Sequence, residues 1–178
     1  VSIGEKVAII GAGGIGFDTA EFLSHAGPST SQDIPAFMQE WGIDMKLDSR
    51  GGIEGVTAKV APSPRQIYLC QRKTTSLGKT LGKTTGWIHR IGLMKKEVKM
   101  LAGCDYVRID DQGLHLLVAS GPQILEVNNI IVCAGQDPLR ELSEGLNIPF
   151  QIIGGADVAA ELDAKRAIDQ GTRLAAKL

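Results

Sequence analysis

The sequence predicts an α/β fold with a central parallel sheet and an additional antiparallel β-meander. Short, continuous apolar runs end in glycine at several points, which is typical of strands buried on both faces of a parallel sheet. Segments with helical spacing of apolar residues follow some of these runs. Between two of the runs, a turn sequence at residues 110–113 separates short alternating segments and predicts a hairpin.

The first predicted elements are a strand over residues 6–10 and a helix over 15–23. Residues 27–64 then change character and become rich in Gly, Pro, Ser and Gln, with one amphipathic stretch over 34–41 that predicts a short helix. We interpret 27–64 as an insertion into a βαβ unit, because a structureless connection of that length is unusual. It is expected to be a flap over a nucleotide site or a docking surface, with a plain surface excursion as the alternative.

The remaining predicted strands are short apolar runs bounded by turn residues, and they cover 66–70, 98–101, 106–109, 114–118, 124–127, 129–133 and 150–153. A helix is predicted over 84–96. A second, Ala-rich helix is predicted from about Val158 or Asp163 onward, with Glu161 and Lys165 as an exposed pair one turn apart. No internal repeat interrupts this order.

Composition argues against several classes of function. The 178 residues have a formal net charge of −1, so no global field attracts nucleic acid or an anionic membrane. The longest apolar runs are too short to cross a bilayer, and the absence of a charged, hydrophobic leader leads us to expect a cytoplasmic protein. Cys70, Cys104 and Cys133 lack CxxC spacing, which favours reduced thiols in or near the core over a metal site or a redox pair.

No catalytic residue can be assigned from the sequence. The three histidines, His25, His89 and His115, are scattered, and no acid or nucleophile is placed to form a triad with any of them. We therefore expect surface or core histidines, and neither a catalytic group nor a metal ligand.

The central motif is the glycine-rich segment Gly11-Ala12-Gly13-Gly14-Ile15-Gly16. It follows a buried strand and opens a helix, which is the context of a Rossmann-type dinucleotide site. Gly11 permits the tight turn, Gly13 lets the backbone approach a pyrophosphate, and Gly16 lets helix and strand pack closely. The helix N-terminus offers N–H groups to the phosphates. The alternative is a tight turn without a ligand.

Basic residues at the end of the second strand indicate which nucleotide binds. An NAD-binding unit usually has Asp or Glu there, whereas this sequence has Gln71-Arg72-Lys73. A carboxylate would repel a 2′-phosphate, and a guanidinium can grip one with two hydrogen bonds. The sequence therefore predicts NADP(H), with a solvated basic loop as the alternative. Three further basic residues lie near enough in the sequence to join such a pocket: Lys79, Lys83 and Arg90.

Three other positions are candidate dinucleotide contacts. Asp18 is expected either to face the nicotinamide end or to be a solvated acid in the first part of the helix. Ala134-Gly135 would let a backbone pass close to a dinucleotide, with a plain loop as the alternative. Gly155 and Asp157 follow another strand end; an Asp there is most simply an N-cap, and in two-dinucleotide flavoenzymes it also faces the ribityl–pyrophosphate part of FAD.

Several segments together resemble the C-terminal part of bacterial 2,4-dienoyl-CoA reductase, and the resemblance covers nearly the whole chain. The segments are GEKVAIIGAGGIGFDTAEFLS, SPRQIYLCQRK, LGKTTGWIHR, NNIIVCAGQDP and IIGGADVAAELDAKRAIDQGTRLA, of which GKTTGWIHR and GGADVAAELDAKRAI are the most specific. The resemblance implies an old-yellow-enzyme-type barrel carrying FMN and a 4Fe-4S cluster, followed by FAD- and NADPH-binding domains. NADPH would reduce FAD, the cluster would relay electrons to FMN, and FMN would reduce the dienoyl thioester in fatty-acid β-oxidation.

The resemblance assigns residues 1–136 to the NADP(H)-binding domain and 137–178 to the C-terminal segment of an FAD-binding domain of the two-dinucleotide flavoprotein type. The barrel, the cluster cysteines and the first half of the FAD domain have no match in this sequence, so no catalytic residue carries over. We therefore expect the FAD- and FMN-binding domains of the same polypeptide as partners, and the enoyl-CoA substrate to bind elsewhere. The chain alone is expected to bind NADP(H) without completing the reaction, and to hold FAD weakly or not at all.

Two alternatives remain at this stage. One is the NADPH-binding domain of another old-yellow-enzyme-type flavin reductase with a different substrate. The other is a non-catalytic module that senses NADP(H). A flavin-binding partner domain in the same polypeptide would argue against the second.

Overall fold

The computed structural model describes residues 2–160 and 164–177. The chain divides into two compact units between Ala134 and Gly135. Both sheets belong to the first unit, whereas the described part of the second unit contains short 3₁₀ turns and one α-helix. No helix within the described residues is long and apolar enough to span a membrane.

A four-stranded parallel sheet forms the centre of the first unit, with strand order β3-β2-β1-β7. Its strands are β1 (Lys6–Ile10), β2 (Gln66–Cys70), β3 (Lys99–Leu101) and β7 (Asn129–Val132). In the register, Val7 lies between Ile67 of β2 and Asn129 of β7. Because all the strands are parallel, their carboxyl ends meet at one edge of the sheet, where ligands of open α/β sheets bind.

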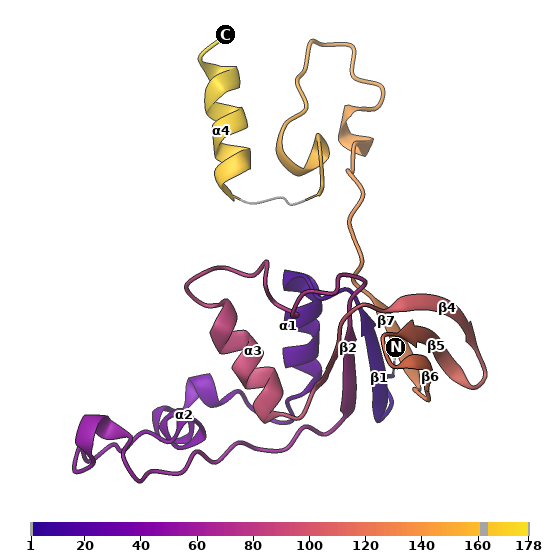
Figure 1. Ribbon diagram of the computed structural model, residues 1–178. Helices are drawn as coiled ribbons and strands as arrows, with labels where there is room; N and C mark the ends of the chain where they lie inside the picture. The colour runs from indigo at the N-terminus through magenta and orange to yellow at the C-terminus, as the bar shows by residue number, and fades with distance from the viewer. Residues whose placement is uncertain (1, 161–163, 178) are drawn as a thin grey trace. The chain divides into compact units, whose positions relative to one another are not determined.

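Helices α1 (Gly14–Leu23) and α3 (Gly86–Lys95) cover one face of this sheet (Figure 1). Alternate residues of β1 serve the two faces, as the period of a strand requires. Val7 and Ile9 pack in one core cluster with Phe17 of α1 and Leu93 of α3. Burial on both faces explains why β1 appears in the sequence as a continuous apolar run.

The other face is covered by an antiparallel meander of β4 (Asp105–Asp110), β5 (Gly113–Val118) and β6 (Gly121–Leu125). Leu114 and Leu116 of β5 pack against Ala8 and Ile10 of β1 in a second core cluster. The predicted α/β fold with a parallel sheet and a β-meander is therefore confirmed. The strand predicted over 124–127 is wrong in its bounds, because β6 begins at Gly121 and ends at Leu125. The Gly121-Pro122 pair suggested a later start, but a proline is tolerated in a strand at the edge of a sheet.

The insertion over 27–64 contains α2 (Ile34–Trp41) and the 3₁₀ turns η1 (Thr30–Gln32) and η2 (Arg50–Gly52). The Asp33 side chain caps α2 by accepting a hydrogen bond from the Ala36 amide at 3.0 Å, and the helix ends at Gly42, whose φ is 71°. The Lys95 ammonium of α3 lies 4.5 Å from the ring centroid of Trp41, which links the insertion to α3. The short helix predicted over 34–41 is confirmed.

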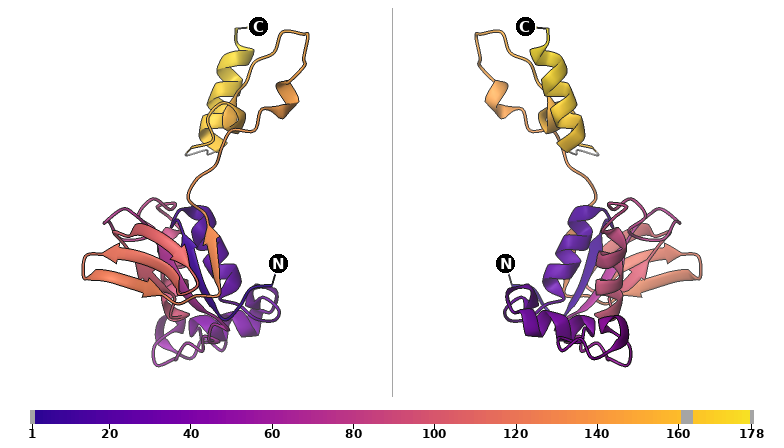
Figure 2. Two further views of the ribbon diagram at one scale, coloured as in Figure 1. Left: turned by 90° about the vertical axis from the view of Figure 1, so that its right-hand side faces the viewer. Right: turned by 90° about the vertical axis from the view of Figure 1, so that its left-hand side faces the viewer.

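The insertion joins the end of α1 to the start of β2, so it lies at the edge where the parallel strands begin (Figure 1, Figure 2). Val60 and residues 62–64 border a groove there with Lys6 and Lys99, at the starts of β1 and β3. The predicted flap over the nucleotide site is therefore wrong for a site at the glycine motif, because that motif lies at the opposite edge. A role as a docking surface stays a prediction.

The second unit contains η3 (Glu141–Ser143), η4 (Gly154–Ala156) and α4 (Ala164–Ala175). The strand predicted over 150–153 is wrong: this segment pairs with no strand in the described part of the chain, and a lone strand leaves its backbone groups without partners. Residues 158–160 are not helical, so Val158 does not begin the last helix. The alternative start at Asp163 and the pair formed by Glu161 lie outside the described residues.

Candidate nucleotide-binding site

The glycine turn joins the carboxyl end of β1 to the start of α1. The Gly11 amide donates a hydrogen bond to the Cys70 carbonyl at 2.9 Å, and its φ is 110°, a conformation that favours glycine. A Cβ atom at Gly11 would lie 2.3 Å from the carbonyl oxygen of Cys133. Backbone from β1, β2 and the end of β7 therefore converges here too closely for any side chain.

Gly16 and Gly13 occupy opposite environments. A Cβ atom at Gly16 would lie 1.8 Å from the Gly11 carbonyl oxygen, so glycine is required for α1 to pack against the turn. At Gly13 and Gly14 an added Cβ would meet nothing within 4 Å. Gly13 is the N-cap of α1 and supplies no side-chain cap, so no cap side chain engages the first N–H groups of the helix. This geometry is the one that the sequence predicts for a phosphate cradle.

A cleft of about 200 Å³ brings the glycine turn together with the basic end of β2. Its walls come from the ends of β1 and β2, from the loop before α3, from β4 and from the residue after Cys133. The lining residues are Ile10, Gly11, Ala12, Gly13, Gln71, Arg72, Lys73, Thr80, Tyr106 and Ala134. The fold thus places the predicted residues Gly11, Gly13, Arg72, Lys73 and Ala134 around one opening.

Hydrogen bonds hold the backbone of the basic loop in place. The Gln71 side-chain amide donates to the Lys73 and Thr75 carbonyls. The Gly103 and Cys104 amides donate to the Lys73 and Gln71 carbonyls at 3.0 and 2.9 Å. Within the described residues, no hydrogen bond or ion pair engages the exposed side chains of Arg72 and Lys73. Two uncompensated positive charges therefore stand on a fixed backbone at the rim of the cleft.

Other predicted residues lie apart from the cleft. Asp18 is exposed on α1 and lines a different groove with Glu21 and His25. Gly16 is buried behind the turn, and Gly14 opens α1 beside it. The three additional basic candidates do not line the cleft, which takes Thr80 from that loop instead: Lys79, Lys83 and Arg90. Gly135, Gly155 and Asp157 belong to the second unit.

In the second unit, a glutamine side chain organises the segment that carries Gly155 and Asp157. Gln170 of α4 accepts a hydrogen bond from the Gly154 amide at 2.7 Å and donates to Oδ2 of Asp157 at 3.1 Å. Arg140 donates to the carbonyl oxygens of Ala156 and Asp157 at 2.8 and 2.7 Å. The sequence suggested that Asp157 is an N-cap. It is not the N-cap of α4, because non-helical residues separate it from that helix.

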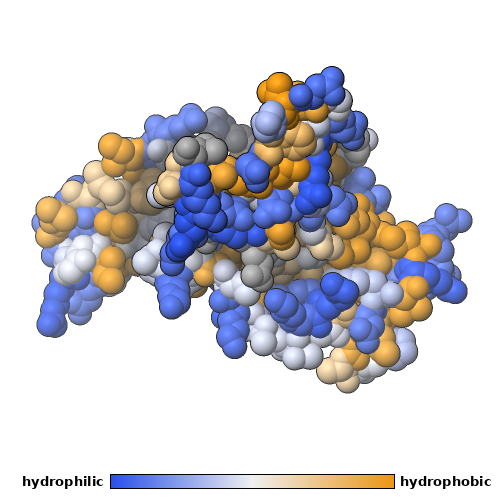
Figure 3. Space-filling view, turned by 90° about the horizontal axis from the view of Figure 1, so that it is seen from above, coloured by the Kyte–Doolittle hydropathy of each residue, from blue (hydrophilic) through white to orange (hydrophobic). Residues whose placement is uncertain are grey.

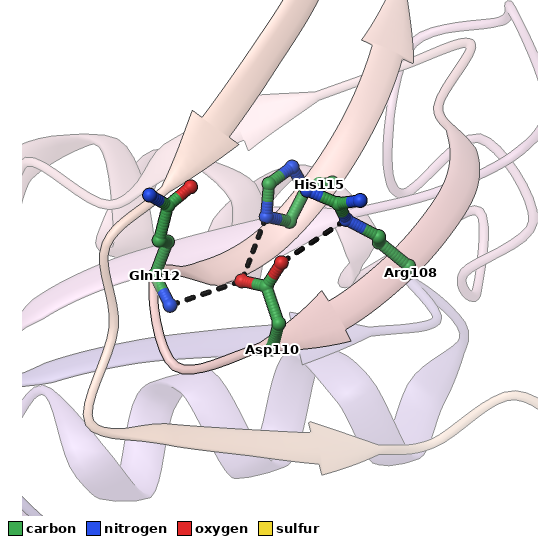
Figure 4. A network of polar contacts seen from close by, with 4 residues as sticks. All are labelled: Arg108, Asp110, Gln112 and His115. Carbon is green, nitrogen blue, oxygen red and sulfur yellow. Dashed lines mark hydrogen bonds and ion pairs between the residues drawn. The ribbon is translucent and has the colours of Figure 1, made fainter.

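One histidine, His115, belongs to a network that the sequence did not suggest (Figure 4). Nε2 of His115 lies 2.8 Å from Oδ1 of Asp110, and Nε of Arg108 lies 3.0 Å from Oδ2. The hydrogen bond from His115 is the main cause that lowers the pKa of Asp110. The register of β4 and β5, which pairs Arg108 with His115, creates this network, so residue spacing alone did not reveal it. No nucleophile joins the contacts drawn, and the network fixes the tip of the hairpin.

The described cysteines are free, and Cys70 and Cys104 are buried, as predicted. Burial raises the pKa of the Cys70 thiol to about 12, so that it stays protonated and unreactive at neutral pH. Within the described residues, no group of three or more His, Cys, Asp or Glu side chains could hold a metal ion.

Tyr106 and Thr80 are the lining residues that sequence reasoning missed. Tyr106 is the second residue of β4, and its buried hydroxyl oxygen has no hydrogen-bond partner in the part of the chain that the structure describes. Burial raises the pKa of this hydroxyl, which keeps it protonated. The only feature of the sequence that could have indicated this role of Tyr106 was its polar hydroxyl at a position of the meander that otherwise faces the core.

Comparison with solved structures supports the fold. The chain superposes on 2-naphthoyl-CoA reductase with a TM-score of 0.64 at 19% identity, over 96% of this chain and 21% of that one. It superposes on the HOCl-induced flavoprotein disulfide reductase RclA from Escherichia coli with a TM-score of 0.50 at 10% identity, over 93% of this chain and 33% of that one. The chain thus spans between a fifth and a third of the length of these two proteins. A sequence model of the pyridine nucleotide-disulphide oxidoreductase family matches residues 2–166. With so much of its length matched, the chain belongs to the pyridine nucleotide-disulphide oxidoreductase family.

Proposed function

We propose that residues 1–136 bind NADP(H) and present it for hydride transfer to FAD in a flavin-dependent reductase. The observation that carries this proposal is the cleft in which the glycine turn meets Arg72 and Lys73. Membership of a family of pyridine nucleotide oxidoreductases supports both cofactors. When bound, NADPH would supply the hydride, and the residues of this chain would hold and orient it.

The cleft divides the binding task between two sides. The open backbone at Gly13 and the uncapped start of α1 suit the pyrophosphate, because free N–H groups and the helix dipole favour an anion. Arg72 and Lys73 suit a 2′-phosphate, since nothing within the described residues neutralises them. A volume of about 200 Å³ is small for a whole dinucleotide, so this cleft would receive its phosphate-bearing adenosine end.

The nicotinamide end would then extend beyond the cleft. Asp18, one turn into α1, remains our candidate for a contact there, although it lines a different groove. We also keep Ala134 and Gly135 as residues beside which a dinucleotide would pass.

For the second unit we propose the returning end of an FAD-binding domain, with Gly155 and Asp157 as FAD contacts. The fastening of this segment by Gln170 and Arg140 supports the idea, because it presents a defined turn. The rest of the FAD site would come from another part of the same polypeptide. Hydride transfer would therefore require more than the residues of this chain.

Within this class we propose a 2,4-dienoyl-CoA reductase that also carries FMN and a 4Fe-4S cluster in other domains and acts in fatty-acid β-oxidation. The support is the residue pattern of GKTTGWIHR (82–90) and GGADVAAELDAKRAI (154–168). The structural likeness to 2-naphthoyl-CoA reductase, at 19% identity, supports the shared fold. The enoyl-CoA substrate would bind outside this chain.

The test is calorimetric titration of the chain with NADP⁺ and NAD⁺, before and after Arg72→Ala. Loss of a charge-assisted, two-pronged hydrogen bond is expected to weaken NADP⁺ binding by about ten- to a hundredfold and to leave NAD⁺ binding unchanged. Arg90→Ala, an exposed arginine outside the cleft, is the matched control and should change neither affinity. Equal effects of both substitutions would remove the proposed role of Arg72.

A further inference from the structure

We infer that the Tyr106 hydroxyl is a hydrogen-bond partner of the 2′-phosphate and a determinant of the preference for NADP(H) over NAD(H). This inference rests on the proposed function, which supplies the nucleotide. The proposed site then has a neutral donor from the meander in addition to the charged donors of the basic loop. The meander lies on the other side of the cleft from the helices.

The observation behind it is a contrast between two tyrosines of the same core cluster. Tyr68 of β2 accepts a hydrogen bond from the Gln66 side chain at 3.0 Å. The Tyr106 hydroxyl oxygen is buried, and no hydrogen-bond partner reaches it from the described residues. Buried tyrosine hydroxyls are usually hydrogen-bonded, so one without a partner at the wall of a cleft calls for an explanation.

The surroundings offer the Tyr106 hydroxyl little else. Its buried neighbours include Cys70 and Cys104, which are weak hydrogen-bonding groups, and the Cys104 thiol already donates to the Leu101 carbonyl at 3.5 Å. A partner for Tyr106 must therefore enter through the cleft that its side chain lines.

Arg72 indicates what that partner is. Arg72 and Tyr106 both line this cleft, so a ligand group bound by the guanidinium there lies beside the tyrosine side chain. The positive charge of Arg72 also lowers the pKa of the Tyr106 hydroxyl, although burial outweighs this effect and keeps the group protonated. A phosphate there offers three oxygens, so a guanidinium that takes two leaves an acceptor for a third donor. Because the hydroxyl is buried in the free chain, this contact requires the phenol ring to turn toward the cleft.

This account predicts effects of opposite sign on stability and on binding. Tyr106→Phe removes a buried hydroxyl that has no partner in the free chain, so the Tm should stay the same or rise by about 2 °C. The same substitution removes a donor to a charged phosphate, so NADP⁺ should bind about tenfold more weakly. A purely structural role would instead lower the Tm and leave binding unchanged.

The experiment titrates wild-type chain and Tyr106→Phe with NADP⁺, NAD⁺ and adenosine 2′,5′-bisphosphate, and records Tm values without ligand. Tyr68→Phe is the matched control, expected to lower the Tm slightly and to leave all affinities unchanged. The inference holds if Tyr106→Phe weakens the two ligands that carry a 2′-phosphate and leaves NAD⁺ within about twofold.

Three results would overturn the inference. Unchanged binding by Tyr106→Phe would remove the hydroxyl from the site. Equal weakening of NADP⁺ and NAD⁺ would move the contact to the part that the two nucleotides share. A wild-type chain that binds none of the three ligands would overturn the proposed function and this inference together.

Discussion

The two units of the chain differ most in what they do with their apolar side chains. The first unit buries them on both faces of a parallel sheet, in clusters centred on residues such as Ile9 and Leu116. In the second unit only Ala159 is a buried apolar side chain among the described residues, while Leu142 is 95% exposed and Leu139 68% exposed. Figure 3 shows, in orange, that apolar side chains also reach the surface on the face it views.

This difference shows which interactions stabilise each unit. Burial of apolar surface is the main driving force of folding, and the first unit obtains it from its own residues. The second unit relies on polar fastening through Arg140 and Gln170. We therefore expect substitutions to affect stability strongly in the first unit and weakly in the second.

The largest expected effect comes from alanine at Gly16. A Cβ atom there would lie 1.8 Å from a backbone oxygen, so Gly16→Ala should destabilise the first unit by more than about 4 kcal/mol, measured by urea denaturation. An added Cβ at Gly92 on α3 meets nothing within 4 Å, and at Gly171 on α4 it makes an ordinary contact of 3.7 Å with Ile153, so Gly92→Ala and Gly171→Ala should stabilise their helices by up to about 1 kcal/mol. If Gly16→Ala unfolded at the wild-type urea concentration, the close packing of turn and helix would be refuted.

The next effect contrasts two leucines. Leu69 is fully buried in β2, and Leu69→Ala should cost about 2–5 kcal/mol of unfolding free energy. Leu142→Ala in the second unit should change it by less than about 0.5 kcal/mol. A comparable loss at both positions in thermal denaturation would show that the second unit has a core of its own.

The contrast between the two units also explains which structural elements could be predicted from the sequence. The strand at residues 6–10, the tight turn of the glycine motif and the hairpin turn are local patterns, and each forms as predicted. The strand predicted over 150–153 looked equally apolar, but a strand exists only with a partner, and local sequence does not reveal one.

Contacts between segments that are distant in the sequence could not be predicted from local patterns either. The tight approach of Gly11 to Cys133, the place of Tyr106 in the cleft and the pairing of His115 with Asp110 all depend on how strands are ordered and registered. Arg72 was predictable because its place at the end of β2 follows from topology alone.

The smallest expected effect lies at the tip of the meander. The pKa of Asp110 is lowered from its ordinary value of 3.8, so its contacts with His115 and Arg108 stabilise the hairpin fully above pH 3.8 and are lost as the pH falls through the lower folded value. Hydrogen exchange should show the hairpin amides losing protection in that range. Asp110→Asn should lose some protection already at neutral pH, whereas Asp111→Asn, outside the network, should not.

The measurement that tests the central claim most directly is an NMR titration of the chain with NADP⁺, which reports on every backbone amide. Our account predicts the largest shifts at Gly13, Gly14 and Ile15, and at the Arg72–Lys73 pair, with little change at the start of the parallel strands. Shifts confined to the groove beside the insertion, or no shifts at the glycine turn while NADP⁺ binds, would contradict it.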